Sequence, residues 1–408
     1  MHTHLLSILR SSLTGLPLQI NPAIEWFSDG DLKTGILESA DGEQFPVIAG
    51  IPILTDDYQR NAAFQSIQSG HAEEAYHDLL NGQPAYWVEN GAQTFQSLLY
   101  QFVGRWSADY FYFRRSDPTF LSGLSLLRAA RGQPGWAFDL GCGCGHNSEI
   151  LLKLSPEKRV IGLDSTFKLL YLARQFIAPQ ADFVCADLEN GLPFASGMAG
   201  TVLCSDTFSF IRNKWGAARE MLRLTRPDGR ILVTRLLITP PAHWNPLRFH
   251  LFPSQFYAPY FESMQVARFA DEALRLAYLG SASLEENSSF GENEQSFSLA
   301  ASPAGLPESA LSPFLDPYDT ESLYVNPLYS RAGESGWRRE WPSPTYVQDY
   351  EDRSSYLPPS LALPPEISHQ PGSKGKLEDL LRRRVLLSLP KCYGHVTPLQ
   401  QVEDPWTA

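Results

Sequence analysis

The chain has 408 residues with a formal net charge of −12, and 43% of its residues are hydrophobic. That length favours two or three structural units, and the apolar fraction excludes a disordered or fibrous chain. The negative charge argues against nucleic acid as a partner, because binding phosphates needs concentrated Lys and Arg. The five cysteines lack the spacing of a disulfide framework, so we expect reduced thiols and a cytoplasmic protein.

Neither the beginning of the chain nor any later segment carries a membrane-targeting pattern. Residues 1–20 contain only short apolar runs, so we expect no signal peptide. No stretch approaches about 18 consecutive apolar residues, and we therefore expect no membrane span. The sequence does not fix the oligomeric state.

The N-terminal region has the pattern of a small β structure followed by helices. Residues 35–54 contain two short β-type runs separated by Gly50, which predicts a hairpin. From residue 56 to residue 135 apolar side chains recur at helical spacing, first around Leu79 and again around Leu98.

Strand-like and helix-like patterns alternate regularly in the centre of the chain. Such alternation predicts βαβ units and a parallel, doubly wound sheet, which is an α/β fold. The predicted strands are 136–140, 159–163, 181–185, 200–204 and 230–235, and the predicted helices are 148–154, 167–176 and 215–224.

The pattern becomes irregular after residue 240. Residues 260–280 have an amphipathic helical pattern, whereas residues 281–313 are rich in Ser, Gly, Glu and Asn and are expected to form an exposed loop. Residues 377–389 favour either a closing helix or a helix that continues into a strand. The expected units are a small β-rich module over 1–58, a helical lead-in over 59–133, the α/β core over 134–280 and a loop-rich aromatic extension over 281–408.

A glycine-rich turn follows the first predicted strand of the core. Residues 139–145 have the sequence D-L-G-C-G-C-G and lie between a strand and a helix. Glycines let the chain turn tightly and let a ligand approach the backbone. The dinucleotide pattern G-x-G-x-x-G requires a glycine where this chain has His146, and the missing G-K-S/T sequence excludes a P-loop. The turn therefore favours a ligand other than a pyrophosphate.

Two carboxylates end the next two predicted strands. Asp164 lies about twenty residues after the turn, where a carboxylate accepts hydrogen bonds from ribose hydroxyls. Asp187 ends the third strand, where it can accept a hydrogen bond from an adenine amine. Each residue taken singly is also compatible with a helix N-cap. Together with the glycine turn, the two acids predict a nucleoside site.

At these residues the segment 136–235 resembles the class I S-adenosylmethionine-dependent methyltransferases of the ubiquinone-biosynthesis type. The acid, the alternating glycines and the two strand-end acids occur in the family's order, and the sequence LRLTRPDG at 222–229 is similar to its L-R-P-G-G element, with Asp228 in place of a glycine. The resemblance implies a Rossmann-like class I methyltransferase fold and S-adenosyl-L-methionine as cofactor. The cofactor-binding residues that it implies are Asp139, Gly141, Gly143, Gly145, Asp164, Ser165, Asp187, Leu188 and Ser205.

Residues 35–57 resemble a second family, the zinc-ribbon-like modules related to the activator subunit of tRNA methyltransferases. The pattern F-P-V-x-x-G-I-P-x-L is matched from Phe45 to Leu54. No cysteine precedes Cys142, so a thiolate zinc site cannot form in this module. We therefore expect a degenerate module, held by apolar packing, and no metal site.

The first resemblance implies methyl transfer to an oxygen, nitrogen or carbon atom of a small-molecule substrate. In that family the loops after the fourth and fifth strands border the substrate pocket, so Asp206, His243 and His250 are candidates for a catalytic role, with a structural role as the alternative for each. Aromatic residues crowd both loops, which favours an apolar or aromatic substrate. Two other functions remain open, namely an rRNA or tRNA methyltransferase and a nucleoside-binding protein without chemistry. The aromatics Trp106, Tyr110, Tyr112 and Phe113 are candidates either to cover a sulfonium by cation–π contact or to pack in the core.

Overall fold

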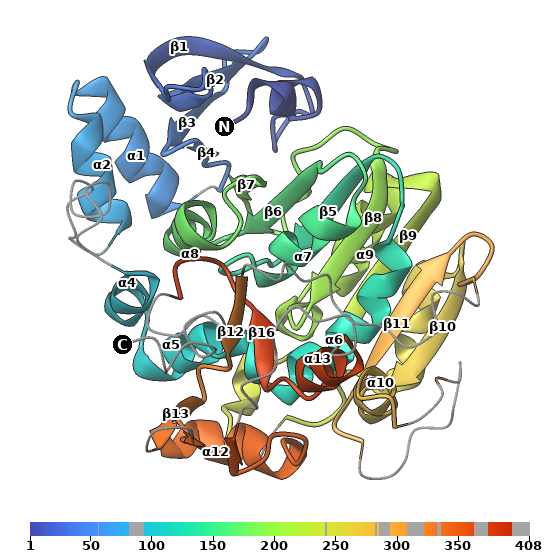
Figure 1. Ribbon diagram of the computed structural model, residues 1–408. Coiled ribbons are helices and arrows are strands. Elements are labelled where there is room, and N and C mark those ends of the chain that lie inside the picture. Colours follow the sequence, from blue (N-terminus) through green and yellow to red (C-terminus); the bar gives the residue numbers. More distant parts are fainter. Residues whose placement is uncertain are drawn as a thin grey trace.

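The computed structural model describes residues 1–55, 57–80, 94–240, 243–281, 284, 294–307, 322–332, 336–362 and 374–393. Figure 1 shows a central sheet flanked by helices, a small N-terminal sheet at one end and C-terminal elements at the other. Among the described residues, no helix has both the length and the apolar character that a membrane crossing requires.

The central sheet has seven strands in the order β10-β11-β9-β8-β5-β6-β7. The strands from β9 to β7 run parallel, and β11 is antiparallel to both of its neighbours. The chain winds from β5 outward to β7 and then crosses to β8 on the other side, so the predicted α/β, doubly wound fold is confirmed (Figure 1). The strands are β5 (Trp136–Leu140), β6 (Val160–Asp164), β7 (Asp182–Cys185), β8 (Ala199–Ser205), β9 (Thr225–Leu237), β10 (Gln265–Ala270) and β11 (Ser296–Ser302).

Alternate residues along these strands are buried in two cores, one on each face of the sheet. Leu203 and Leu232 belong to one core, and their neighbours Val202 and Ile231 belong to the other. Helices α4 to α8 and α10 contribute to the first core, and α9 contributes to the second together with the N-terminal module. The helices are α4 (Phe95–Phe102), α5 (Arg105–Tyr112), α6 (Pro118–Leu127), α7 (His146–Leu154), α8 (Phe167–Leu172), α9 (Lys214–Leu224) and α10 (Asp271–Tyr278).

The N-terminal module is a four-stranded antiparallel sheet followed by two helices. Its last two strands form the predicted hairpin, in which Val47 pairs with Pro52. The chain beyond this hairpin lies along β7, where Ile53 pairs in parallel with Cys185. The module therefore covers the edge of the central sheet. Its elements are β1 (Leu18–Trp26), β2 (Leu32–Ser39), β3 (Gln44–Ile48), β4 (Ile51–Pro52), α1 (Tyr58–Gln68) and α2 (Ala72–Leu79).

The C-terminal extension packs against the core through buried polar groups. Arg384 is 2% exposed and its Nε donates a hydrogen bond of 3.0 Å to the carbonyl oxygen of Arg115. A helix followed by a strand occupies residues 374–388, which is the second of the two predicted alternatives. The extension contains β12 (Leu323–Val325), β13 (Tyr329–Ala332), β14 (Gly336–Arg339), α12 (Pro344–Tyr350), β15 (Ser360–Ala362), α13 (Lys374–Arg382) and β16 (Leu386–Ser388).

Two expectations for the segment after residue 240 are wrong. Residues 260–280 are not one helix, because β10 precedes α10. The stretch expected to be an exposed loop contains β11, which lies fully buried between β9 and β10. Its serines are satisfied inside the protein, since Ser298 donates to Asp271 at 2.5 Å and accepts from the backbone nitrogen of Arg235 at 3.1 Å. The sheet therefore continues beyond residue 280, where the sequence placed the end of the core.

Candidate functional site

A cavity of about 300 Å³ opens at the carboxyl ends of β5, β6 and β8. Ligands of doubly wound sheets bind at this edge, and the volume is within the range of small-molecule sites. The glycine turn and Asp164 form one wall, the residues that follow β8 form another, and aromatic side chains of α5 cover the space. The lining includes Trp106, Tyr110, Phe111, Arg114, Gly141, Gly143, Asp164, Ser205, Asp206, Thr207, Phe210 and Trp244.

The glycine turn presents bare backbone to this cavity. Gly141 and Gly143 have φ angles of 72° and 52°, in the region that favours glycine. A Cβ atom on Gly141 would lie 2.3 Å from the side chain of Thr207, and one on Gly143 would lie 2.6 Å from the ring of Phe111. Neither position therefore has room for a larger residue.

Asp164 stabilises the wall that it forms with the glycine turn. Its Oδ2 accepts a hydrogen bond of 3.0 Å from the backbone nitrogen of Gly143, and its Oδ1 accepts one of 3.0 Å from the backbone nitrogen of Thr166. Burial raises the pKa of Asp164, and these backbone donors oppose the shift. Each carboxylate oxygen has a further lone pair, so the residue can still accept hydrogen bonds from a ligand in the cavity.

Gln59 of the N-terminal region fixes the turn that follows Asp164. Its side-chain amide donates to the carbonyl oxygen of Ser165 at 2.8 Å and accepts from the backbone nitrogen of Phe167 at 2.9 Å. The sequence analysis did not identify Gln59, since nothing local to α1 indicates which loop its side chain contacts.

Other residues implied by the resemblance lie outside the cavity. Asp139 is 1% exposed beneath the turn and accepts a hydrogen bond of 2.7 Å from Ser148. Burial raises its pKa to about 7. Gly145 begins α7, and a Cβ there would lie 3.0 Å from Ala173. These two residues therefore pack beneath the glycine turn, on the side away from the cavity, and stabilise its conformation.

Asp187 caps the turn that follows β7, and no helix begins at that turn. Its Oδ1 accepts a hydrogen bond of 2.9 Å from the backbone nitrogen of Glu189, and its Oδ2 accepts one of 3.2 Å from Asn190. Neither Asp187 nor Leu188 lines the cavity, and Ser165 is exposed and does not line it either. The adenine contact of Asp187 thus stays a prediction.

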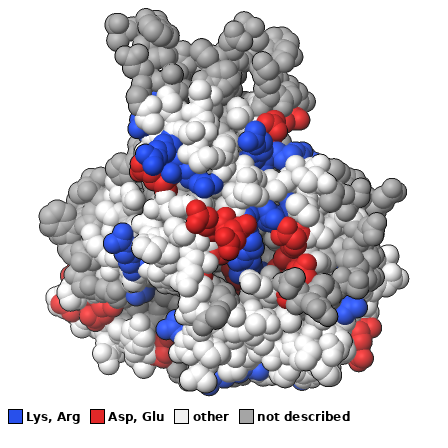
Figure 2. All heavy atoms as spheres, turned by 90° about the horizontal axis from the view of Figure 1, so that it is seen from below, with Lys and Arg blue, Asp and Glu red and all other residues white. Residues whose placement is uncertain are grey.

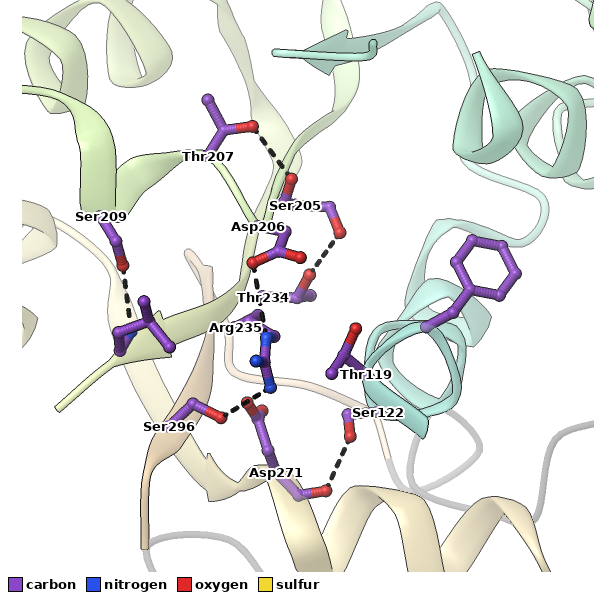
Figure 3. Close-up of polar contacts among 12 residues, drawn as sticks. Thr119, Ser122, Ser205, Asp206, Thr207, Ser209, Thr234, Arg235, Asp271 and Ser296 are labelled. Atoms are coloured by element: carbon purple, nitrogen blue, oxygen red, sulfur yellow. Dashed lines mark hydrogen bonds and ion pairs between the residues drawn. The ribbon is translucent and has the colours of Figure 1, made fainter. Parts of the chain in front are cut away.

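Asp206 follows β8 and lies between two buried guanidinium groups, of which Figure 3 shows that of Arg235. Its Oδ1 is 3.4 Å from Nε of Arg235 at the neighbouring strand end, and its Oδ2 is 3.5 Å from Nη2 of Arg114. The hydroxyl of Tyr110 donates to the same Oδ2 at 3.0 Å. Burial disfavours both guanidinium charges, but the neighbouring carboxylates, Asp117 first for Arg114 and Asp206 first for Arg235, hold the pKa of each above its usual value.

The backbone at this pair of strand ends is unusual. Asp206 and Arg235 have φ angles of 56° and 58°, a region that residues other than glycine rarely adopt. Such conformations persist where the surrounding structure fixes them, and they are concentrated at functional sites. Neither arginine was identified from the sequence, although an Arg inside the apolar run of β9 is itself a signal of a buried ion pair.

The aromatic cover of the cavity is held by a carboxylate of the C-terminal extension. Asp349 of α12 is 7% exposed and accepts hydrogen bonds from Nε1 of Trp106 at 3.0 Å, Nε1 of Trp244 at 2.9 Å and Nε2 of His243 at 2.7 Å. The rings of Trp106 and Trp244 meet edge to face with their centroids 5.6 Å apart. One acid thus joins α5, the loop after β9 and the extension.

The three catalytic candidates are therefore in different positions. Asp206 lines the cavity. His243 does not line it, and it hydrogen-bonds Asp349, the same acid that holds Trp244. His250 does not line the cavity, and its backbone nitrogen donates to Ser209 at 2.9 Å. Of the aromatic candidates, Trp106 and Tyr110 line the cavity, whereas Tyr112 and Phe113 are buried in the core.

A second cavity of about 330 Å³ lies on the other side of the Asp206–Arg235 pair. Figure 2 shows acidic and basic side chains around a hollow on the face seen from below. The second cavity is likewise lined by both acidic and basic side chains. Asp206 lines the first cavity and Arg235 lines the second, so their ion pair separates the two. The charged lining of the second cavity is Arg235, Asp271, Glu272, Arg275, Glu294 and Arg353.

Residues 138–233, which carry the glycine turn and both strand ends, match the family model of a methyltransferase domain. This segment is a methyltransferase domain. It comprises β5 to β9 of the central sheet up to Val233, so the Rossmann-like order of those strands and the family match agree.

Proteins of established function are similar to parts of the chain. The trans-aconitate 2-methyltransferase of Azoarcus sp. (strain BH72) is 30% identical over 26% of this chain and 42% of that protein. The malonyl-[acyl-carrier protein] O-methyltransferase of Legionella pneumophila is 30% identical over 28% of this chain and 39% of that protein. The demethylmenaquinone methyltransferase of Thermotoga maritima is 26% identical over 33% of this chain and 64% of that protein. The chain thus spans less than two thirds of the length of each.

Solved structures similar to the chain are distant. A chain from the complex of the Haloferax volcanii Trm112 methyltransferase activator with a methyltransferase is 14% identical, with a TM-score of 0.36, over 52% of this chain and 98% of that one. A methyltransferase from Aquifex aeolicus is 14% identical, with a TM-score of 0.35, over 48% of this chain and 98% of that one. In the present chain, regions on both sides of the methyltransferase domain contact the surroundings of its cavity. Gln59 contacts the turn after Asp164, and Asp349 contacts Trp106 and Trp244 of the lining.

Proposed function

We propose that the chain is an S-adenosylmethionine-dependent methyltransferase that acts on a small molecule. The observation that carries the proposal is that the glycine turn, Asp164, Asp206 and an aromatic cover line one cavity within a methyltransferase domain. The wall with the glycine turn and Asp164 would bind the nucleoside part of the methyl donor, and the wall with Asp206 and the aromatic side chains would bind the acceptor. Both ligands would then meet in the same cavity.

The residues of the first wall fit the cofactor. Gly141 and Gly143 carry no side chain on this wall, and Asp164 has lone pairs for ribose hydroxyls. Phe111 already rests on Gly143, so the donor would share this face with its ring. The sulfonium of S-adenosylmethionine supplies an activated methyl group, so the chain mainly contributes alignment and the exclusion of water.

The second wall favours a flat or apolar acceptor with one polar group. Trp106, Trp244 and Phe210 line it, and aromatic rings bind planar ligands through area and stacking. The Asp206 carboxylate is the polar group at its end, and it can take a proton from an oxygen or nitrogen nucleophile as the methyl group is transferred. Arg114 and Arg235 hold this carboxylate in place through ion pairs.

By their names, these relatives methylate trans-aconitate, malonyl-[acyl-carrier protein] or demethylmenaquinone, which supports a small-molecule acceptor for this chain. The N-terminal module is part of the same proposal. The four-stranded sheet of this module favours a zinc-ribbon-like module without thiolate ligands. The contact of Gln59 with Ser165 favours a role for the module in stabilising the turn after Asp164.

The proposal is tested by measuring S-adenosylhomocysteine formed by the purified chain with a panel of aromatic and carboxylated small acceptors. We expect product with one acceptor class and none without an acceptor. Tight binding of S-adenosylhomocysteine without turnover on any acceptor would favour the binding protein instead. Methylation of RNA, together with an RNA affinity that falls steeply with salt, would favour the rRNA or tRNA enzyme.

A further inference from the structure

Two histidines near the start of the described chain meet a buried acid of the central sheet. Nδ1 of His2 lies 3.1 Å from Oδ1 of Asp182, and Nε2 of His4 lies 3.1 Å from Oδ2 of the same residue. The three potential ligand atoms lie within 4.8 Å of one another. Neighbouring ligands of a tetrahedral zinc ion, each about 2.0–2.2 Å from the metal, are separated by roughly 3.3–3.6 Å, which is close to the present distances between the histidine nitrogens and the carboxylate. The two imidazole rings are stacked 7° from parallel, so they must turn for both nitrogens to point at one ion.

We propose that His2, His4 and Asp182 form a binding site for a divalent transition metal ion, with zinc as the preferred ion. Two imidazoles and a carboxylate are a recurrent protein donor set for zinc, and imidazole favours zinc, copper and nickel over magnesium or calcium. The side chain of His4 is 53% exposed, which leaves one side of the site open for water as a further ligand.

The second ring nitrogen of His2 has the partner that a metal ligand requires. Its Nε2 lies 3.2 Å from Oδ2 of Asp31, and metal-bound histidines usually donate their other N–H group to a carboxylate. Nδ1 of His2 is buried and faces the carboxylate of Asp182 at 3.1 Å without the geometry of a hydrogen bond. A metal ion bound between Nδ1 and Asp182 would give this buried nitrogen a ligand bond.

The donors are held in place by their surroundings. Met1 and Leu5 are fully buried on either side of the two histidines, and the backbone nitrogen of His2 donates to Asp182 at 3.2 Å. The side chain of Asp182 is 3% exposed. Preorganised donors bind metal more tightly because little side-chain freedom is lost.

The local charge suits a dication. Asp182, Asp31 and Asp29 interact electrostatically with Arg174 and with the α-amino group of Met1, so carboxylates outnumber these two cationic groups around the imidazoles. An ion here would join the first turn of the chain to β7, the strand along which the N-terminal module lies. The donors are different from the four thiolates of a zinc ribbon, so the missing cysteines do not argue against this site.

The test uses the full chain with a C-terminal affinity tag that contains no histidine, stripped with a chelator and then titrated with zinc chloride by calorimetry. We expect one zinc ion per chain and a melting temperature that rises with zinc. His4→Ala should weaken zinc binding at least tenfold, and Asp31→Asn should weaken it about 10–100-fold. His71→Ala is the matched control, since His71 is also an exposed histidine, and it should bind zinc as the parent does.

Two results would overturn the site. One is uptake of less than one zinc ion per chain together with an unchanged melting temperature, which would leave His2 and His4 as ion-pair partners of Asp182. The other is equal zinc affinity of the parent and the His4→Ala variant, which would place any bound zinc elsewhere. Because His4 is half exposed, its replacement should leave the chain folded, and circular dichroism of the stripped variant checks this.

Discussion

Asp349 accepts a hydrogen bond of 2.7 Å from His243, although the two residues are 106 positions apart in the sequence. The same carboxylate holds the indole nitrogens of two tryptophans that line the first cavity. The extension is therefore part of the cavity's cover. A substitution in α12 should act on ligand binding.

Asp349→Ala should loosen this cover. Hydrogen bonds to a charged group are worth about 1.5–3 kcal/mol each, so we expect the affinity for S-adenosylhomocysteine or the acceptor to fall about tenfold or more. The fluorescence of Trp106 and Trp244 should change as well. Calorimetry and tryptophan emission measure the two effects. Asp352→Ala, which replaces an exposed acid three residues further along the chain, is the control and should leave both unchanged.

His243→Ala removes a smaller part of the same arrangement. Because His243 lies behind Trp244 and does not line the cavity, we expect nearly unchanged affinity for S-adenosylhomocysteine and a lower turnover number. Titration and a turnover assay on one preparation separate the two quantities. An unchanged turnover number would remove His243 from the catalytic candidates.

Asp164→Ala should lower the affinity for S-adenosylhomocysteine about tenfold or more, because two hydrogen bonds to a charged acceptor are lost. Asp187→Ala should have a smaller effect, since its oxygens are engaged with Glu189 and Asn190 outside the cavity. Both variants are compared by calorimetry with Asp228→Ala, a substitution of an exposed acid. Equal losses for Asp164 and Asp187 would support the adenine contact that the family resemblance implies. No loss for Asp164→Ala would contradict the ribose contact.

Asp206→Asn should destabilise the fold as well as impair turnover. Removing one partner of a buried ion pair costs about 3–5 kcal/mol, and here Arg235 would lose its charged neighbour. Asparagine tolerates the positive φ of this position, so the substitution tests charge and leaves backbone strain unchanged. Urea unfolding gives the free energy, with Asp228→Asn as the control. A variant as stable as the parent would show that Asp206 does not stabilise the two arginines.

Asp139 gives a pH dependence whose sign follows from its burial. Its pKa is raised to about 7 in the folded protein, from 3.8, so the folded state holds the proton more tightly than the unfolded state. The stabilisation is complete below about pH 4 and is lost as the pH rises through 7. Relative to Asp139→Asn, the parent should therefore lose stability between pH 5 and 7, by about 1.4 kcal/mol per pH unit at most. Parallel urea-unfolding curves for the two proteins over this range would contradict the shift.

The sequence by itself determined the centre of this protein. Alternating strand and helix patterns, the D-L-G-C-G-C-G turn and the acid at 164 depend on neighbours within a few residues or on the order of elements along the chain. Strand polarity and the right-handed βαβ connection then bring the strand ends to one edge. The position of Asp206 beside the turn follows from this order as well.

Tertiary structure decided the rest, because the partners are far apart in sequence. Gln59 contacts Ser165, Asp349 contacts Trp106, and Arg235 faces Asp206 only after the sheet has assembled. The strand β11 could not be predicted for a related reason. Its serine-rich composition is typical of a loop, and these serines can lie in a buried strand only because donors and acceptors of other segments satisfy them. Local patterns report which face a residue occupies, whereas the partner that satisfies a buried polar group is selected by the fold.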